Sequence, residues 1–123
     1  MNIETALKEA MNIEGALGAA LVDWGSGMPL GTLGGSKYLD LDLAAAGNTE
    51  VVRAEMRAMA SLSLDDMIED ILITLGSQYH LLRPLASADG APSLFLYVAL
   101  DRSKANLALA RHQLRLIEGV LTF

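Results

Sequence analysis

Cysteine is absent from this sequence of 123 residues, which excludes a disulfide scaffold and cysteine-ligated zinc. Basic residues are also few, since 9 Lys and Arg stand against 15 Asp and Glu and leave a net charge of −6. Nucleic acids and anionic membranes attract proteins through clusters of Lys and Arg, so neither is an expected partner. The longest apolar run, 94–100, is far shorter than the roughly 20 residues that cross a bilayer. The N-terminus lacks the pattern of a signal peptide, and the expected location is the cytoplasm.

Aromatic residues are scarce at 5%, whereas hydrophobic residues as a whole make up 52%. The core must therefore be built mainly from Leu, Ala, Ile, Val and Met. This composition favours a packed globular chain over a disordered one. The length fits one domain, and no linker, repeat or low-complexity segment divides it. Residues 1–123 are therefore expected to form a single domain.

Three segments have the hydrophobic spacing of helices: 3–13, 40–63 and 104–118. Gly15 is a plausible stop signal for the first. Asp40 or Asp42 is placed to cap the second, and Asp101 or Ser103 to cap the third, which Gly119 follows.

Five segments have the composition of strands: 16–23, 28–32, 68–75, 78–85 and 93–101. In the first and last segments, apolar residues occupy both alternating sets of positions. This predicts central strands that are covered on both faces. The glycines of 24–27 and the pair Asp89-Gly90 predict hairpin turns. The order α-β-β-α-β-β-β-α predicts an α/β protein of the α+β sandwich type. We expect a five-stranded, mostly antiparallel sheet with helices on both faces.

The segment 40–63 is predicted to carry two apolar stripes, because its hydrophobic residues fall on two sides of a helix of 100° per residue. One stripe is rich in small residues and comprises Gly47, Val51, Ala54, Ala58 and Leu62. The other is bulkier and comprises Ala45, Val52, Met56 and Met59. A helix with two stripes needs a second apolar partner besides its own sheet. Small residues allow close helix contact, so the first stripe is favoured for that partner and the second for the sheet, with the reverse left open.

The order of elements and five local runs resemble the roadblock/dynein light chain family over roughly residues 3–118. The runs are IEGA at 13–16, LVD at 21–23, EDILIT at 69–74, FLYVALDR at 95–102 and ANLALAR at 105–111. These are core and turn positions, with no catalytic signature among them. The bacterial type is the nearer comparison. The hairpin at 24–27 and the long connection 33–41 depart from the usual pattern.

The resemblance implies a dimer in which the middle helices pack across a two-fold axis and an edge strand pairs with its mate. Carried onto this chain, the dimer interface comprises Leu43, Ala46, Gly47, Val51, Ala54, Ala58, Ile71 and Ile73. Many members of the family act on or beside small Ras-like GTPases, and others are dynein adaptors. The expected partners are thus a second copy of the chain and either a small Ras-like GTPase or a sensor kinase.

A charged patch beside the presumed dimer axis is the candidate partner surface. Glu50, Arg53 and Arg57 have helical spacing there, although Glu50 and Arg53 can simply pair with each other. Trp24 at the hairpin tip is a second candidate. It is either an exposed interaction residue or a side chain folded back on the sheet.

No catalytic, cofactor-binding or metal-binding residue is predicted. The run 34–37 lacks the spacing of a phosphate-binding loop and is interpreted as a connector. His80 and His112 occur in no metal-ligand pattern, and both are interpreted as exposed or hydrogen-bonded histidines. The acidic cluster at 65–70 is interpreted as a solvated turn. Lys104, Arg111 and Arg115 are interpreted as a solvated helix face.

The sequence therefore predicts a non-catalytic homodimeric interaction module that regulates or scaffolds a small Ras-like GTPase. A small-molecule sensor or general adaptor domain of a bacterial signalling complex is the alternative. An enzyme is disfavoured by the missing motifs.

Overall fold

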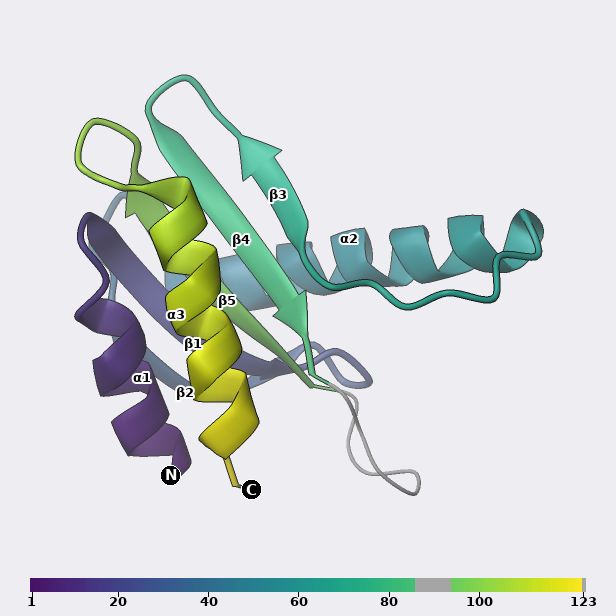
Figure 1. Cartoon of the computed structure of the whole chain (residues 1–123), viewed down its shortest axis with the longest axis horizontal. Helices are drawn as coiled ribbons and strands as arrows, with labels where there is room; N and C mark the ends of the chain where they lie inside the picture. Colours follow the sequence, from purple (N-terminus) through teal and green to yellow (C-terminus); the bar gives the residue numbers. More distant parts are fainter. Residues whose placement is uncertain (86–93, 123) are drawn as a thin grey trace.

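The computed structural model describes residues 1–85 and 94–122 and contains the predicted order of elements (Figure 1). They are α1 (Ile3–Met11), β1 (Ala16–Asp23), β2 (Met28–Gly34), α2 (Leu41–Ser61), β3 (Ile71–Thr74), β4 (Gln78–Pro84), β5 (Leu94–Asp101) and α3 (Leu107–Val120). The predicted turn at Asp89-Gly90 lies outside the described residues. None of these helices is both long enough and apolar enough to span a membrane.

The five strands form one sheet in the order β2-β1-β5-β4-β3. Every neighbouring pair is antiparallel, which confirms the predicted architecture. β1 lies between β2 and β5, and β5 lies between β1 and β4, so the two strands predicted to be central are central. β2 and β3 form the edges.

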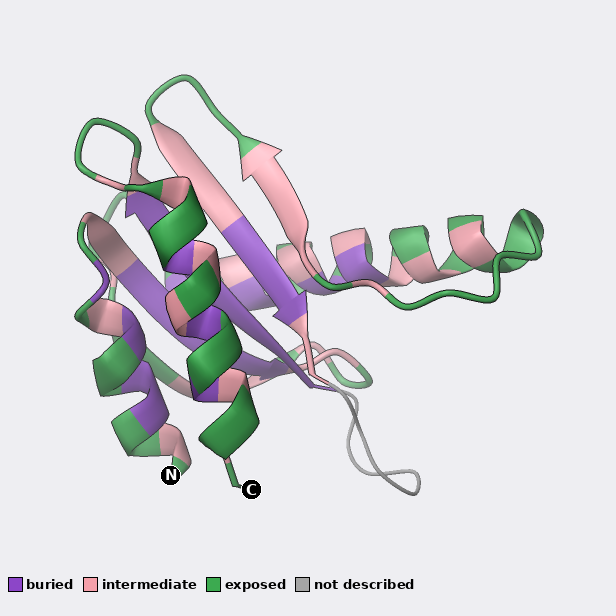
Figure 2. Ribbon diagram, in the orientation of Figure 1, coloured by how far each residue is buried: buried purple, intermediate pink, exposed green. Residues whose placement is uncertain are grey.

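Helices cover both faces of the sheet, as predicted. α1 and α3 lie side by side on one face, and α2 crosses the other (Figure 1). On β5, Leu96 and Val98 belong to the core under α1 and α3, whereas Phe95 and Tyr97 belong to the core under α2. This alternation explains why the β5 sequence is apolar in both registers. Figure 2 shows the buried residues concentrated in the central strands and the inner sides of the helices.

β3 is shorter than predicted, because it begins at Ile71 and not at residue 68. Leu75 N donates to Gln78 O, which fixes the register of the two strands. Gln78, His80 and Leu82 then exchange backbone hydrogen bonds with β3, and Pro84 is the next residue whose backbone faces that strand. Pro84 has no N–H to donate to Glu69. The pairing therefore stops at Leu82, and residues 68–70 leave the sheet.

The first and last helices also differ from prediction at their ends. α1 ends at Met11, and Gly15 lies beyond it in the turn to β1 with φ of 88°. A Cβ at Gly15 would lie 3.1 Å from two backbone atoms, so this close approach requires glycine. α3 is capped by Asn106, whose side chain accepts from Leu109 N. Asp101 instead closes the preceding turn by accepting from Ser103 N and Oγ, and Gly119 lies inside the helix.

Candidate functional site

α2 begins at a local signal and packs one of its two stripes on the sheet. The Asp40 carboxylate accepts hydrogen bonds from Asp42 N at 3.0 Å and Leu43 N at 3.2 Å, so of the two predicted caps Asp40 is the one used. Ala45 and Val52 are fully buried against the strands. These residues come from the bulkier stripe, which the sequence assigned to the sheet.

The small-residue stripe of α2 faces away from the sheet and is uncovered in the single chain. Ala46, Gly47, Ala54 and Ala58 are exposed, Val51 is half-buried, and Leu43 is 71% exposed. A Cβ added at Gly47 would meet nothing within 4 Å. The outer face of α2 therefore has room for another backbone to approach closely.

α2 is longer than the sheet that it crosses. Its 21 residues span roughly 32 Å, whereas four spacings between neighbouring strands add up to only about 19 Å. Its C-terminal half therefore projects past β3 (Figure 1), and the projecting part is largely exposed (Figure 2). Met56 and Met59, expected to pack on the sheet, are only half-buried for this reason.

The projecting half of α2 and the chain that returns from it form an exposed apolar surface that the sequence analysis did not find. Leu62 is 69%, Leu64 53% and Met67 77% exposed. A groove of about 460 Å³ runs between this segment and β4, lined by Met56, Met59 and Met67 among others. Several large apolar side chains exposed next to one another are typical of interaction sites. The sequence signal that could have located it is the length of the helix relative to the width of a five-stranded sheet.

β3 adds a free sheet edge to the same side of the molecule. Ile71 and Ile73 are half-buried and pack against the apolar cluster under α2. Their hydrogen-bonding groups point to β4, so the N–H and C=O groups of Leu72 and Thr74 point outward. Within residues 1–85 and 94–122, no strand pairs with this outer edge. The structure thus brings the predicted interface residues of α2 and β3 to one side.

Arg53, predicted as part of a partner surface, is engaged within the chain. Its Nε donates to Trp24 O at 3.0 Å and its Nη2 to Gly25 O at 2.8 Å, which ties α2 to the β1–β2 hairpin. Its Nη1 pairs with Glu50 Oε1 at 2.9 Å. Trp24 is half-buried and packs against the cluster under α2, so it is folded back. Arg57 is exposed on the same helix and presents its charge to solvent.

The two histidines have different surroundings. His80 on β4 contacts Gln78 through Nε2 at 2.8 Å and the Tyr97 hydroxyl through Nδ1 at 3.3 Å. Burial lowers the pKa of His80 and raises the pKa of Tyr97 to about 12, because both charged forms would lose solvation. His80 is thus a hydrogen-bonded histidine of the sheet, and His112 is exposed on α3.

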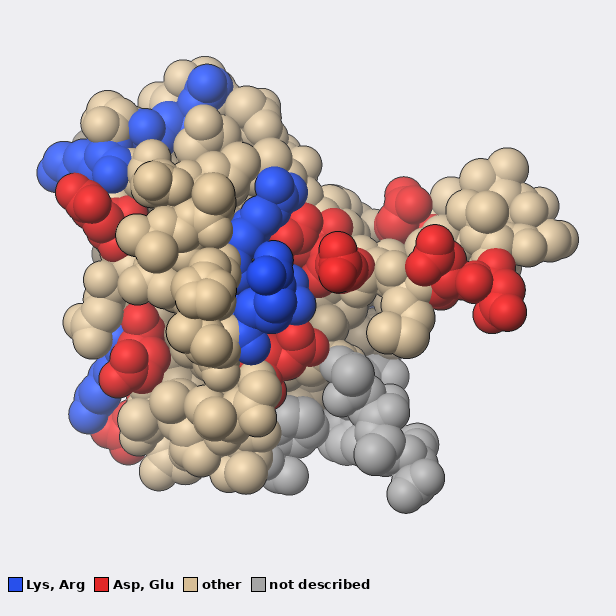
Figure 3. All heavy atoms as spheres, in the orientation of Figure 1, with Lys and Arg blue, Asp and Glu red and all other residues tan. Residues whose placement is uncertain are grey.

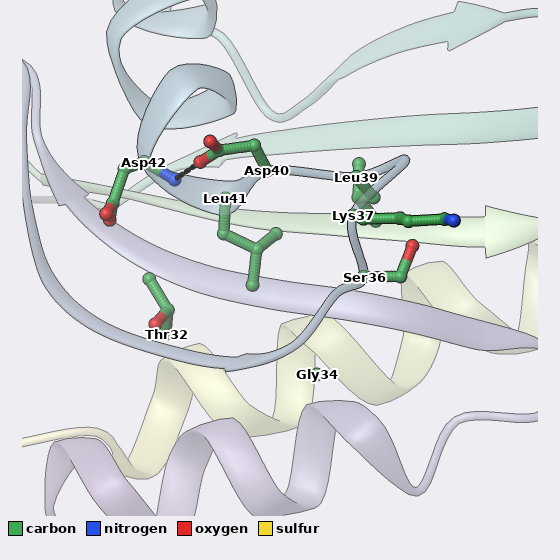
Figure 4. Close-up of a pocket in the computed structure, with 8 residues that line it drawn as sticks. All are labelled: Thr32, Gly34, Ser36, Lys37, Leu39, Asp40, Leu41 and Asp42. Carbon is green, nitrogen blue, oxygen red and sulfur yellow. Dashed lines mark hydrogen bonds between the residues drawn. The ribbon is translucent and has the colours of Figure 1, made fainter.

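The connector between β2 and α2 borders a pocket of about 300 Å³ (Figure 4). Lys37 lines it, but so do the carboxylates of Asp40 and Asp42. Gly35 N donates to Leu17 O, and the first N–H groups of α2 donate to Asp40. An anion would meet few free donors and two negative charges there, which agrees with the interpretation of 34–37 as a connector.

Asp70 of the acidic cluster at 65–70 is engaged within the chain. Asp70 accepts two hydrogen bonds from Arg111, at 2.9 and 3.1 Å. Among the described residues, no group of three or more His, Asp or Glu side chains is placed to hold a metal ion. The Arg111 pair also ties α3 to the segment that leads into β3.

Comparisons with known proteins identify the fold. No protein-family model and no curated protein sequence matches the chain. Among solved structures, the Roadblock/LC7 domain from Streptomyces avermitilis has a TM-score of 0.80 at 12% identity, over 97% of this chain and 93% of that one. Myxococcus xanthus MglB has a TM-score of 0.72 at 19% identity, over 94% and 77%. MglB in a tetrameric arrangement has a TM-score of 0.73 at 17% identity, over 94% and 81%. The chain therefore has the Roadblock/LC7 fold that its sequence resemblance predicted.

Proposed function

We propose that this chain is a homodimeric, non-catalytic interaction module that regulates or scaffolds a small Ras-like GTPase in the cytoplasm. The observation that carries the proposal is the uncovered outer face of α2 beside the free edge of β3. The roadblock resemblance supplies the class of partner. A sensor kinase or another adaptor takes the place of the GTPase in the alternative reading.

The proposed dimer joins two copies through α2 and β3. The small residues at Gly47, Ala54 and Ala58 would let the two α2 helices approach closely. Leu72 and Thr74 would exchange backbone hydrogen bonds with the mate's β3 and extend the sheet. Each projecting half of α2 would then lie over the mate's sheet, which covers Leu62 and Met67. Pairing also removes a sheet edge that would otherwise promote aggregation.

Disulfide trapping tests this dimer cleanly, because the chain contains no cysteine of its own. Single cysteines at positions 71–74 scan the outer edge of β3, and Thr32→Cys on β2 provides the control at the opposite edge of the sheet. The proposal predicts covalent dimers under mild oxidation for at least one β3 position and none for Thr32→Cys. Light scattering should give a dimer for the unmodified chain, and Ala54→Arg should weaken it. A monomer together with no trapping on β3 would refute the shared sheet.

The GTPase role is tested by recovery of partners from cells that express the chain natively. The tagged protein is incubated with a GTP analogue or with GDP, and bound proteins are identified by mass spectrometry. A Ras-like GTPase enriched with one nucleotide is the expected result. Arg57→Glu should reduce its recovery, whereas Lys8→Glu on α1 reverses a charge on the opposite face and should not. Recovery of a sensor kinase without any GTPase would remove the GTPase role and leave the adaptor alternative.

A further inference from the structure

His80 lies on the α2 face of the sheet, at the end of β4 that α2 leaves uncovered. His80 and Leu82 are two residues apart on one strand, so both side chains point to this face. Leu82 is fully buried in the core under α2, whereas His80 is only half-buried. The projecting part of α2 lines a groove together with Ile71, which is the residue paired with Leu82. α2 therefore crosses the sheet at the Leu82–Ile71 end, and the end that holds His80 and Ile73 remains half-exposed.

The His80 ring is held by two neutral partners. Its Nε2 lies 2.8 Å from Gln78 Oε1, and its Nδ1 lies 3.3 Å from the Tyr97 hydroxyl. This arrangement fits a neutral ring that donates from Nε2 and accepts at Nδ1. A protonated ring donates from both nitrogens, so the Tyr97 hydroxyl would have to accept and would need another acceptor for its own proton. Tyr97 is fully buried, and within the described part of the chain His80 is the one partner of its hydroxyl.

The charged groups near this end of the sheet do not compensate a charge on His80. Asp101 pairs with Gln78 across the strands, but its carboxylate accepts from Ser103 N and Oγ. Glu55 of α2 lines the groove at the other end of β3. Burial is accordingly the cause that lowers the pKa of His80 in the single chain.

The two-fold symmetry of the proposed dimer brings the mate's projecting helix to this end of the sheet. Leu72 and Thr74 carry the outward-facing groups of β3, so full antiparallel overlap pairs Leu72 of one copy with Thr74 of the other. The Ile71 end of each β3 then lies beside the Thr74 end of its mate. Since each α2 crosses its own sheet at the Ile71 end, it continues over the other copy at the end that holds His80.

The segment that reaches His80 is apolar and uncharged. From Met56, which packs in the cluster under α2, to Leu62 the helix advances about 9 Å, and β4 of the mate lies about 10 Å beyond the helix's own β3. Residues 58–64 contain no charged side chain. The charged residues nearest to this run are Glu55, Arg57, Asp65 and Asp66. Figure 3 shows acidic side chains along the projecting part of the molecule and an uncharged tip, so the tip would cover His80 without supplying a counter-charge.

We propose that the dimer through α2 and β3 is sensitive to pH, because protonation of His80 in either copy opposes its coverage by the mate. The inference rests on the proposed dimer and adds a regulatory group to it. A buried cation without a counter-charge is unfavourable, so the neutral ring favours the dimer and the protonated ring favours separate chains. The dimer is therefore strongest above the pKa of His80 in the single chain, and it weakens as the pH falls below about 6.5.

The effect is enlarged because each dimer contains two copies of His80. If the pKa of His80 is lower by about one pH unit in the dimer than in the single chain, the dissociation constant rises by up to about tenfold at each site. With both sites partly protonated, we expect the dissociation constant to be about tenfold larger at about pH 5.5 than at about pH 7.5. Carboxylates titrate mainly below about pH 5, so this range isolates the response of histidine.

Sedimentation equilibrium of the full chain at these two pH values and one ionic strength measures the change. The dissociation constant of the unmodified chain should rise about tenfold at the lower pH, and that of His80→Gln should be the same at both. The matched control is His112→Gln, which replaces the other histidine of the chain. His112 is exposed on α3, on the opposite face of the sheet, so this variant should keep the response. Circular dichroism at both pH values confirms that each chain is folded.

A second measurement follows His80 without replacing it. The pKa of its ring is determined by nuclear magnetic resonance in the unmodified dimer and in the Ala54→Arg variant, which the proposed dimer predicts to be dissociated. The pKa should be lower in the dimer, because only there does the mate exclude water from the ring. Equal pKa values in the two proteins would overturn the proposal.

These measurements separate failure of this proposal from failure of the dimer itself. A chain that is monomeric at both pH values refutes the proposed dimer, and the role of His80 with it. A dimer with the same dissociation constant at both pH values overturns the role of His80 alone. A pH response that persists in His80→Gln does the same.

Discussion

Replacing Arg53 with alanine tests how α2 is held on the sheet. The guanidinium donates to two carbonyl oxygens of the β1–β2 hairpin, Trp24 O at 3.0 Å and Gly25 O at 2.8 Å. It also pairs with Glu50 at 2.9 Å, but Glu50 is 66% exposed. The hairpin is separated from Arg53 by almost 30 residues in sequence, so these bonds connect distant parts of the chain. Their loss should loosen both the hairpin and the helix.

The expected destabilisation follows from the exposure of the groups. A hydrogen bond to a charged group contributes about 1.5 to 3 kcal/mol when it is shielded from water. The Arg53 side chain is 34% exposed, so we take the low end and assign about 2 kcal/mol to the two carbonyl bonds together. The pair with Glu50 adds about 0.3 kcal/mol. Arg53→Ala should therefore lower the free energy of unfolding by about 2 kcal/mol.

Urea denaturation measures this change, and Trp24 provides the signal because it is the single tryptophan of the chain. With a denaturant slope of about 2 kcal/mol/M, the midpoint should fall by about 1 M. The native emission of Arg53→Ala should also shift to the red as Trp24 becomes more hydrated. Arg57→Ala on the same helix is the control and should change stability by less than about 0.5 kcal/mol. Equal midpoints for the two variants would refute the assignment of stability to the hairpin contacts.

Three further predictions have outcomes that thermal or chemical denaturation can measure. The pKa of His80 lies below its value of 6.5 in the unfolded chain, so the unfolded state binds the proton first and stability falls as the pH drops below about 6.5. His80→Gln should reduce this loss of stability at low pH. Asp40→Ala removes the cap of α2 and should lower the free energy of unfolding by about 1 kcal/mol. An unchanged melting temperature would contradict this expectation. Gly15→Ala should destabilise by more than about 1 kcal/mol because φ is positive there. Gly119→Ala inside α3, where an added Cβ meets nothing within 4 Å, should be neutral or stabilising by about 0.5 kcal/mol.

Much of the fold follows from local patterns in the sequence. The sequences of β1 and β5 are apolar on both alternating sets of positions, which predicts central strands. Only a strand with helices on each side of the sheet buries both of its faces. Asp40 predicts the start of α2, since its carboxylate can accept from the first free N–H groups. The glycines near 24–27 predict the hairpin, and Gly27 has the positive φ of 80° that this interpretation requires.

The errors arise where distant residues compete with a local signal. The start of β3 depends on Pro84 in a strand that follows it, so the apolar run from residue 68 is misleading when considered alone. Asp101 is a good capping residue by type, but its carboxylate is taken by Ser103, and Asn106 caps α3 instead. Helical spacing alone places Arg53 among the surface charges, because only the folded chain brings the hairpin carbonyls to it.

In the candidate site, too, local patterns predict some features, whereas others depend on distant parts of the chain. The sequence predicts two stripes on α2 from helical spacing alone, and the structure places Ala45 and Val52 of the bulkier one in the core. The exposure of Leu64 and Met67 could not be predicted in this way, because they follow the helix and no periodic pattern includes them. Their surroundings depend on the overhang of α2, which is a property of the whole sheet.

The features gathered on the α2 face reinforce one another. The α2 face combines small residues, a sheet edge with free backbone groups and a projecting apolar segment, so contact there adds hydrogen bonds to apolar burial. Contact through α2 and β3 together should therefore form at lower concentration than contact through either element alone.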